Sequence, residues 1–210
     1  MASKKRYHFT FSAWKLFLCV LPFIAGCATI STQSTVVRTI ITQPVANSET
    51  ITPKKFNLTG RISIQDEQQR VSGGIRWQHS ETDDEVLLLS PLGQVVTQIL
   101  RDHEGVRLTT SEKQVFYAAD VESLTEDILG WRIPLAGLQY WAQGSHSPVS
   151  IAMKDLDEND RVVAIRQDGW VINYLSYTVV PSEQKERPRV LTLNYEALQI
   201  RLVVDNWETQ

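Results

Sequence analysis

The chain has 210 residues, of which 42% are hydrophobic and 21% are charged, and this globular composition excludes a wholly disordered chain. Its length suits one domain or two small ones. The net charge of −3 gives no sign of the excess positive charge that is typical of nucleic-acid-binding proteins. Residues 1–26 hold four basic residues and no acidic one. The rest therefore has 17 basic against 24 acidic residues, a charge of −7 that suits solubility or a basic partner.

The N-terminus has the organisation of a secretory signal. A basic start at residues 4–6 precedes an apolar core at residues 16–24, which is shorter than the roughly 20 residues that span a bilayer. The small residues 25–26 then precede Cys27, and this ending resembles the lipobox of bacterial lipoproteins. The resemblance implies cleavage before Cys27 and acylation of its thiol. An ordinary signal peptide with an incidental cysteine is the alternative.

Cys19 and Cys27 are the only cysteines, so the body of the chain has no disulfide, no cysteine-based metal site and no thiol nucleophile. Ala28 would be the second mature residue. Retained inner-membrane lipoproteins often carry Asp there, so the resemblance implies export to the outer membrane. Three acyl chains would exceed the two signals that stable anchoring requires.

The segment after the cysteine is rich in Ser and Thr and has no lasting hydrophobic period. Residues 27–55 are therefore predicted to be the lipidated cysteine and a flexible tether with an end-to-end distance of about 30 Å. A strand-like piece at residues 35–42 is a candidate for docking on the folded body.

A period of two begins at Phe56 and predicts strands with one polar face, joined by polar turns into an antiparallel meander. Gly73 and Gly74 in the second strand suggest a bulge or a sharp bend. The predicted strands are 56–64, 71–78, 85–90, 94–101, 106–110, 114–118, 151–156, 162–167, 170–179, 190–195 and 198–204.

Two short amphipathic helices interrupt the strands. Asp120 is the predicted N-cap of a helix over 121–129 that ends at Gly130. A second helix starts at residues 133–134 and stops before Gly144. The fold class is therefore mainly β with short helices (α+β). So many one-faced strands must curl or form two layers, either around an apolar hollow or as a packed sandwich.

Sequence signals for catalysis are missing. The four histidines have no metal-ligand spacing, and the chain contains neither G-x-S-x-G nor a P-loop. Residues 155–160 begin like a calcium-binding loop, but Asp160 stands where that loop needs Gly. We therefore expect a protein that is not an enzyme and holds no metal.

The turn at residues 90–94 has favourable turn residues in Pro91 and Gly93, but an unexpected Leu92 at its tip. Burying a leucine stabilises a fold by roughly 1.5–3 kcal/mol, so an exposed one suggests a function. Folding back of Leu92 onto its own hairpin is the alternative.

Large apolar side chains on both strands and helices either form a plain core or line an acyl-chain cavity. The cavity candidates are Trp77, Leu124, Ile128, Trp131, Leu135, Leu138, Trp141, Trp170 and Tyr174.

Ordered motifs over roughly residues 56–207 resemble the LolB family, the outer-membrane acceptors of lipoproteins. The matching pieces are residues 89–93, 133–138, 141–144, 169–170, 188, 191–193 and 204–207. The resemblance implies an unclosed antiparallel β-barrel with a helical lid over residues 56–210. Its hollow would take lipoprotein acyl chains from the periplasmic carrier LolA, and the loop Pro91, Leu92, Gly93 would deliver them into the outer membrane.

The same resemblance implies a monomer anchored by lipid on the periplasmic face of the outer membrane, with no cofactor beyond the acyl groups on Cys27. Its partners would be the carrier, acyl chains and membrane lipid, not nucleic acid. Exposing acyl chains costs about 0.8 kcal/mol per CH₂, so cargo must stay shielded. The alternative functions are a structural or assembly lipoprotein with a packed core, or an enzyme on a lipid or glycan.

Overall fold

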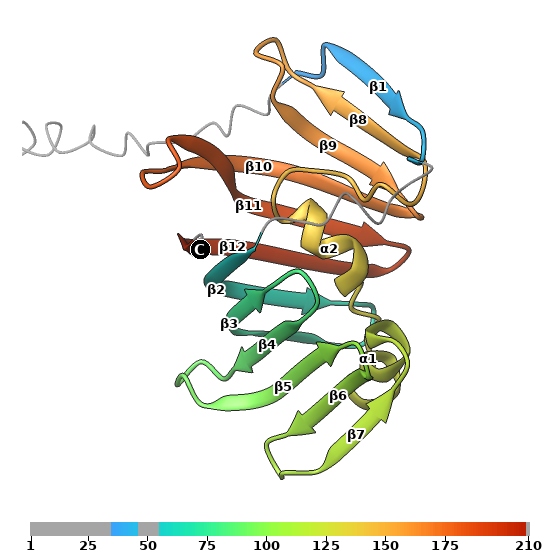
Figure 1. Ribbon diagram of the computed structural model, residues 1–210, viewed down its shortest axis with the longest axis vertical. Coiled ribbons are helices and arrows are strands. Elements are labelled where there is room, and N and C mark those ends of the chain that lie inside the picture. Colours follow the sequence, from blue (N-terminus) through green and yellow to red (C-terminus); the bar gives the residue numbers. More distant parts are fainter. Residues whose placement is uncertain (1–34, 46–54, 209–210) are drawn as a thin grey trace, which may run out of the picture. The chain divides into compact units, whose positions relative to one another are not determined.

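The computed structural model describes residues 35–45 and 55–208. The predicted signal peptide, Cys27 and much of the predicted tether lie outside these residues. The described part forms one antiparallel sheet in the order β1-β8-β9-β10-β11-β12-β2-β3-β4-β5-β6-β7, with two helices against it (Figure 1). Its edge strands β1 and β7 do not pair with each other, so the sheet stays open, as predicted. It is not a sandwich of two sheets.

The strands of this sheet and the two helices have the following bounds: β1 Arg38–Thr42, β2 Phe56–Gln65, β3 Arg70–His79, β4 Asp84–Leu89, β5 Val95–Asp102, β6 Gly105–Thr110, β7 Val115–Ala118, α1 Val121–Leu129, α2 Leu135–Trp141, β8 Ala152–Leu156, β9 Val162–Gln167, β10 Trp170–Val180, β11 Lys185–Tyr195 and β12 Leu198–Glu208.

The strand-like piece in the predicted tether does dock on the body. β1 pairs with β8 in the register Arg38↔Leu156 to Thr42↔Ala152. The Thr39 hydroxyl donates to Asp155 at 2.6 Å. These contacts make β1 an edge strand of the same sheet, so residues 38–42 are not a free linker.

The last hairpins are longer than the hydrophobic pattern predicts. β11 begins at Lys185, ahead of the predicted strand 190–195, and contains Pro188. Proline lacks a backbone N–H and is tolerated at irregular positions in a sheet. Pairing with β10 shifts register around Ser176, where Tyr177 pairs with Pro188, and this irregularity accommodates the proline. β12 likewise continues to Glu208, which buries Trp207.

The prediction of a bulge at Gly73 and Gly74 is wrong, because β3 pairs with β2 without a register shift from Arg70 to His79. The glycines instead permit close approach of β4. A Cβ atom on Gly73 would collide with the Leu89 carbonyl oxygen, and one on Gly74 would lie 3.2 Å from the Leu89 side chain. The actual irregularity lies between Leu88 and Leu89, where β4 pairs with β5.

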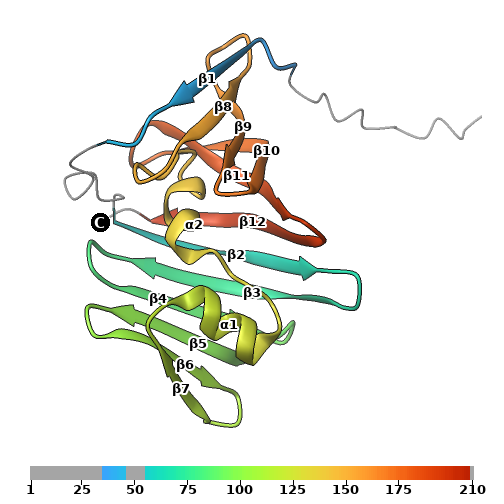
Figure 2. The same cartoon turned by 90° about the vertical axis from the view of Figure 1, so that its right-hand side faces the viewer.

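Both helices form where the pattern predicts them. The Asp120 carboxylate accepts a hydrogen bond from the Ser123 N–H at 2.8 Å, and Gly130 ends α1 in the left-handed conformation with φ 79°. Figure 2 shows α1 and α2 on one face of the sheet. We call this face inner and the opposite face outer.

The core lies between the inner face and the helices. Alternate residues of the central strands point inward and are buried, among them Leu58, Ile75, Ile99, Leu193 and Ile200. Most of their register partners are buried with them, as Trp77 is opposite Leu58 and Val86 is opposite Ile99, since paired residues share a face. The period-two pattern of the sequence therefore becomes one apolar surface that the two helices cover.

Candidate functional site

The turn between β4 and β5 exposes a leucine. Leu92 is 88% exposed, and the turn is held by its own backbone, with the Gly93 N–H donating to the Ser90 carbonyl at 2.8 Å. Gly93 has φ 80°, a conformation that favours glycine. Leu92 does not fold back on its hairpin. The turn is therefore a preformed support for a side chain that contributes no burial to the fold. We call residues 90–94 the Leu92 loop.

Other apolar side chains near this end of the sheet are half exposed. Val95 and Val96 follow the Leu92 loop and are 48% and 37% exposed, and Val71 at the start of β3 is 49% exposed. Lone exposed apolar residues are common. These valines lie on both faces of the sheet, because Val71 pairs with the buried Ile64 whereas Val95 pairs with Leu89, the partner of the outward-facing Gly74.

An apolar groove of about 330 Å³ lies next to the loop on the inner face. We call it the inner groove. Ile62, Ile64 and Val71 form its floor from β2 and β3, and Leu129 and Trp131 cover it from the end of α1. Ser90 and Pro91 also line it, so the groove meets the Leu92 loop. Its volume is at the low end of the roughly 300–1,000 Å³ of ligand pockets.

Of the predicted cavity residues, only Trp131 lines the inner groove. Ile128 is partly buried against the core. Trp141 and Trp170 border a separate, more polar hollow of about 270 Å³. Seven of the candidates are buried in the core: Trp77, Leu124, Leu135, Leu138, Trp141, Trp170 and Tyr174.

Sequence reasoning missed the other groove residues, including Ile62, Ile64, Val71, Leu88 and Leu129. The alternation of apolar residues in the sequence places these side chains on the inner face. It does not tell whether a side chain there packs in the core or borders an open groove. The nearest signal was the glycine pair, since Gly73 and Gly74 line the groove and let Leu89 approach β3 closely.

Helix α2 is fixed to the sheet by polar contacts. The Trp141 indole N–H donates to Gln167 Oε1 at 2.9 Å, and the Tyr174 hydroxyl donates to the Trp141 carbonyl at 2.8 Å. Burial raises the pKa of the Tyr174 hydroxyl well above its ordinary value, so it stays a neutral donor. The Arg187 guanidinium donates to Gln143 Oε1 at 2.9 Å, just beyond the helix.

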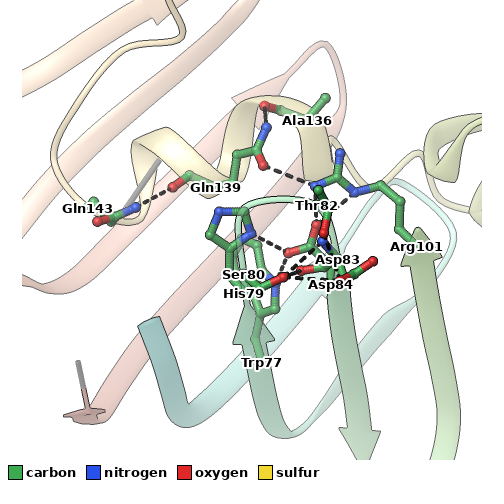
Figure 3. A network of polar contacts seen from close by, with 10 residues as sticks. All are labelled: Trp77, His79, Ser80, Thr82, Asp83, Asp84, Arg101, Ala136, Gln139 and Gln143. Atoms are coloured by element: carbon green, nitrogen blue, oxygen red, sulfur yellow. Dashed lines mark hydrogen bonds and ion pairs between the residues drawn. The ribbon is translucent and has the colours of Figure 1, made fainter. Parts of the chain in front are cut away.

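A buried charge cluster also links the sheet to α2 (Figure 3). The Asp84 carboxylate accepts from the Trp77 indole N–H at 2.7 Å and lies 2.7 Å from His79 Nδ1. Arg101 forms an ion pair with Asp84 and donates to Gln139 Oε1 of α2 at 3.2 Å. The contact to Gln139 connects this pair to the helix.

The environment of Asp84 keeps it ionised. Burial alone would raise the pKa of its carboxyl, but the hydrogen bond with His79 and the positive charge of Arg101 outweigh burial and lower it. The cluster is a structural tie and not a metal site: no group of three histidine or carboxylate side chains in residues 35–45 and 55–208 could hold a metal ion. In the same residues, no helix is long and apolar enough to cross a membrane.

The fold and the site define a class of mainly β proteins in which one open antiparallel sheet packs against two short helices, with an apolar groove beside a protruding apolar turn. A family model described as "Outer membrane lipoprotein LolB" matches residues 54–207. The chain therefore belongs to the LolB family. It is an outer-membrane lipoprotein of the Lol pathway, anchored by lipid, and not an enzyme.

Curated relatives named outer-membrane lipoprotein LolB match along nearly the whole chain. The protein of Nitrosomonas europaea is 44% identical over 91% of this chain and 90% of its own length. That of Thiobacillus denitrificans is 41% identical over 89% of this chain and 92% of its own length. A solved putative outer membrane lipoprotein-sorting protein domain from Vibrio parahaemolyticus aligns at 12% identity over 75% of this chain and 86% of its own, with a TM-score of 0.44.

Proposed function

We propose that this protein accepts lipoproteins from a LolA-type periplasmic carrier, shelters their acyl chains on the inner face, and inserts them into the outer membrane. One observation carries the proposal: the exposed Leu92 lies directly beside an apolar groove. Ser90 and Pro91 of the Leu92 loop also line that groove. Acyl chains leaving the groove would meet the membrane where the loop enters it.

In this proposal acyl chains first occupy the inner groove. Its volume of about 330 Å³ is small for several chains, so cargo requires a helix to move. Helix α2 is held through Trp141, Gln139 and the segment after it. The end of α1 is linked by the Trp131 indole N–H, which donates to Asp66 at 2.8 Å. We therefore propose that α1 is the helix that moves. Its movement would expose Leu124 and Ile128 to the acyl chains.

The remaining predicted cavity residues would then line the deeper end of an opened hollow: Trp77, Leu135, Leu138, Trp141, Trp170 and Tyr174. Acylated Cys27 would hold the body near the membrane, and the protein would act as a monomer without a cofactor. A bilayer buries acyl chains more completely than a groove does, so relative affinities would set the direction of transfer without nucleotide hydrolysis.

The experiment is transfer of a labelled lipoprotein from a LolA-type carrier to residues 28–210, which contain every strand and helix that the structure describes. We expect capture by the soluble protein. Val71→Glu should block capture because it places a charge on the wall of the inner groove. Val179→Glu is the matched control, because Val179 is 60% exposed and does not line the inner groove.

No capture by a folded 28–210 protein would reject the acceptor function. It would favour the competing function, a structural or assembly lipoprotein. That alternative is supported by the close burial of most predicted cavity residues, among them Trp77, Leu138 and Trp141.

A further inference from the structure

A second groove adjoins the inner groove at the Leu92 loop and extends onto the outer face. The two grooves share the lining residues Ile62, Ser72, Gly73, Gly74, Leu89, Ser90 and Pro91. The volume of the second groove is about 560 Å³, and its residues Arg61, Ser63 and Arg201 come from the neighbouring strands β2 and β12. Register places these side chains on the outer face, since Arg61 pairs with Gly74 and Val203, and Ser63 pairs with Arg201. We call it the outer groove.

Gly74 also lines this hollow. It faces outward between Arg61 and Leu89 in the cross-strand register and contributes no side chain of its own, and the Leu89 side chain lies against it. Most of its lining surface is apolar, and the lining residues with polar side chains are Arg61, Arg201, Ser63, Ser72 and Ser90. No carboxylate lines it. Guanidinium and hydroxyl groups together are the donors that phosphate oxygens prefer.

The charge of the groove differs from that of the whole protein. Residues 27–210 carry a net charge of −7, and several exposed arginines are neutralised by acids, as Arg38 is by Asp160. Arg61 pairs with Asp205 at 3.0 Å at the edge of the groove. Arg201 is exposed and has no ion pair within the part of the chain that the structure describes. An anionic ligand would therefore meet an available cation here.

The position of the groove indicates the source of the anion. Pro91 and Gly93 line it and directly flank Leu92. Consecutive Cα atoms are about 3.8 Å apart, so the groove begins within one residue of the side chain that would enter the membrane. Apolar faces of interfacial elements enter the headgroup and acyl boundary by about 5–10 Å. With Leu92 at that depth, the mouth of the outer groove would be level with lipid phosphates.

We propose that the outer groove binds the phosphodiester headgroup of an anionic bilayer phospholipid through Arg61 and Arg201 while Leu92 enters the apolar layer. The proposal rests on the proposed function for the role of Leu92. It adds a site that orients the loop on the membrane and offsets the repulsion between an acidic body and an anionic bilayer.

The test is binding of residues 28–210 to phosphatidylcholine vesicles with and without phosphatidylglycerol, measured by flotation. We expect stronger binding when phosphatidylglycerol is present. Arg201→Gln should weaken that binding about fivefold. Adding Arg61→Gln should weaken it further, by less than a second factor of about five because Asp205 already balances the Arg61 charge. Binding to phosphatidylcholine alone should change little.

Arg107→Gln is the matched control. Arg107 is an exposed arginine on β6 whose register places it on the same outer face, and it borders a different hollow with Asp102 and Glu104. Equal losses for Arg107→Gln and Arg201→Gln would overturn the proposal in favour of nonspecific charge attraction. So would unchanged binding of the double variant. Thermal melting of each variant establishes that it is folded.

Two further measurements separate the outcomes. Inorganic phosphate should release the protein from phosphatidylglycerol vesicles better than chloride does at equal ionic strength, because it competes for the same guanidinium groups. Release by phosphate that is no greater than release by chloride would mean that the groove does not hold the lipid phosphodiester, and would overturn the lipid assignment. Acyl capture from the carrier, measured without vesicles, tests the proposed function separately. If acyl capture fails while vesicle binding still depends on the two arginines, the proposed function is rejected and the headgroup site is retained.

Discussion

At the scale of single residues, Leu92 occupies a position that folding alone does not explain. Burial of a leucine is worth roughly 1.5–3 kcal/mol, and at 88% exposure Leu92 forgoes nearly all of it. The loop is built without this side chain, through the Ser90 carbonyl and the left-handed Gly93. The identity of residue 92 can therefore change without changing the fold.

We expect Leu92→Glu to alter the free energy of unfolding by less than about 0.5 kcal/mol in urea, because no core contact is lost. Delivery of lipoprotein from the protein to membranes should fall severely, since a carboxylate resists entry into an apolar layer. Val115→Glu, at another half-exposed valine, is the control and should deliver normally. A large loss of stability in Leu92→Glu would contradict this interpretation.

Asp84 is the residue whose charge matters most to the fold. Its carboxylate is fully buried and balances Arg101, so Asp84→Asn leaves that guanidinium without its counter-charge. We expect a loss of about 3 kcal/mol in urea unfolding, at the low end for broken buried pairs because Arg101 is partly exposed. Asp83→Asn, at the exposed neighbouring carboxylate, should cost far less.

The pH dependence follows from the direction of the Asp84 pKa. The pKa is lowered in the folded protein, so its contribution to stability is present above the unfolded value of about 3.9 and is lost as pH falls through the folded value. Stability of the native protein should therefore fall below about pH 4 more steeply than that of Asp84→Asn. Parallel acid-unfolding curves for the two proteins would contradict this assignment.

At the scale of elements, the contact between β3 and β4 controls both grooves. Gly73 faces inward and Gly74 outward, and both lie against Leu89. The side chain of Leu89 can rotate away from a new Cβ atom, whereas its carbonyl oxygen is held in the backbone. The two glycines should therefore differ in how they tolerate alanine.

We expect Gly73→Ala to destabilise the protein by about 1–3 kcal/mol, because the backbone of β4 must shift. Gly74→Ala should cost less, since its nearest neighbour at 3.2 Å is the Leu89 side chain. Urea unfolding measures both, and hydrogen exchange of the β3 and β4 amides should show faster opening in Gly73→Ala. Equal effects of the two substitutions would contradict the close-approach explanation.

At the scale of the whole molecule, the −7 charge of residues 27–210 should act on encounter with a carrier whose opening is basic. We expect the association rate of residues 28–210 with a LolA-type carrier to fall as ionic strength rises, while the dissociation rate changes less. Stopped-flow mixing at several salt concentrations measures both. An association rate independent of salt would exclude electrostatic steering.

Much of the fold was predictable because it depends on local periodicity. Alternation from Phe56 onward located the strands, and Asp120 and Gly130 marked α1, since capping acts within a few residues. The ends of β11 and β12 were not predictable. They depend on pairing between distant residues, which tolerates Pro188 at an irregular register and buries Trp207.

By itself, the sequence determined the fold class and the family resemblance, because periodicity and ordered motifs are local properties. It left open whether Leu92 folds back on its hairpin, and the structure decided that Leu92 is exposed. Only the tertiary structure decided which apolar residues stay packed and which border open space. That distinction depends on what lies across the sheet, as Leu89 lies across from Gly73 and Gly74. Packing between distant strands also brought Arg61 and Arg201 together, and no local pattern in the chain encodes their proximity.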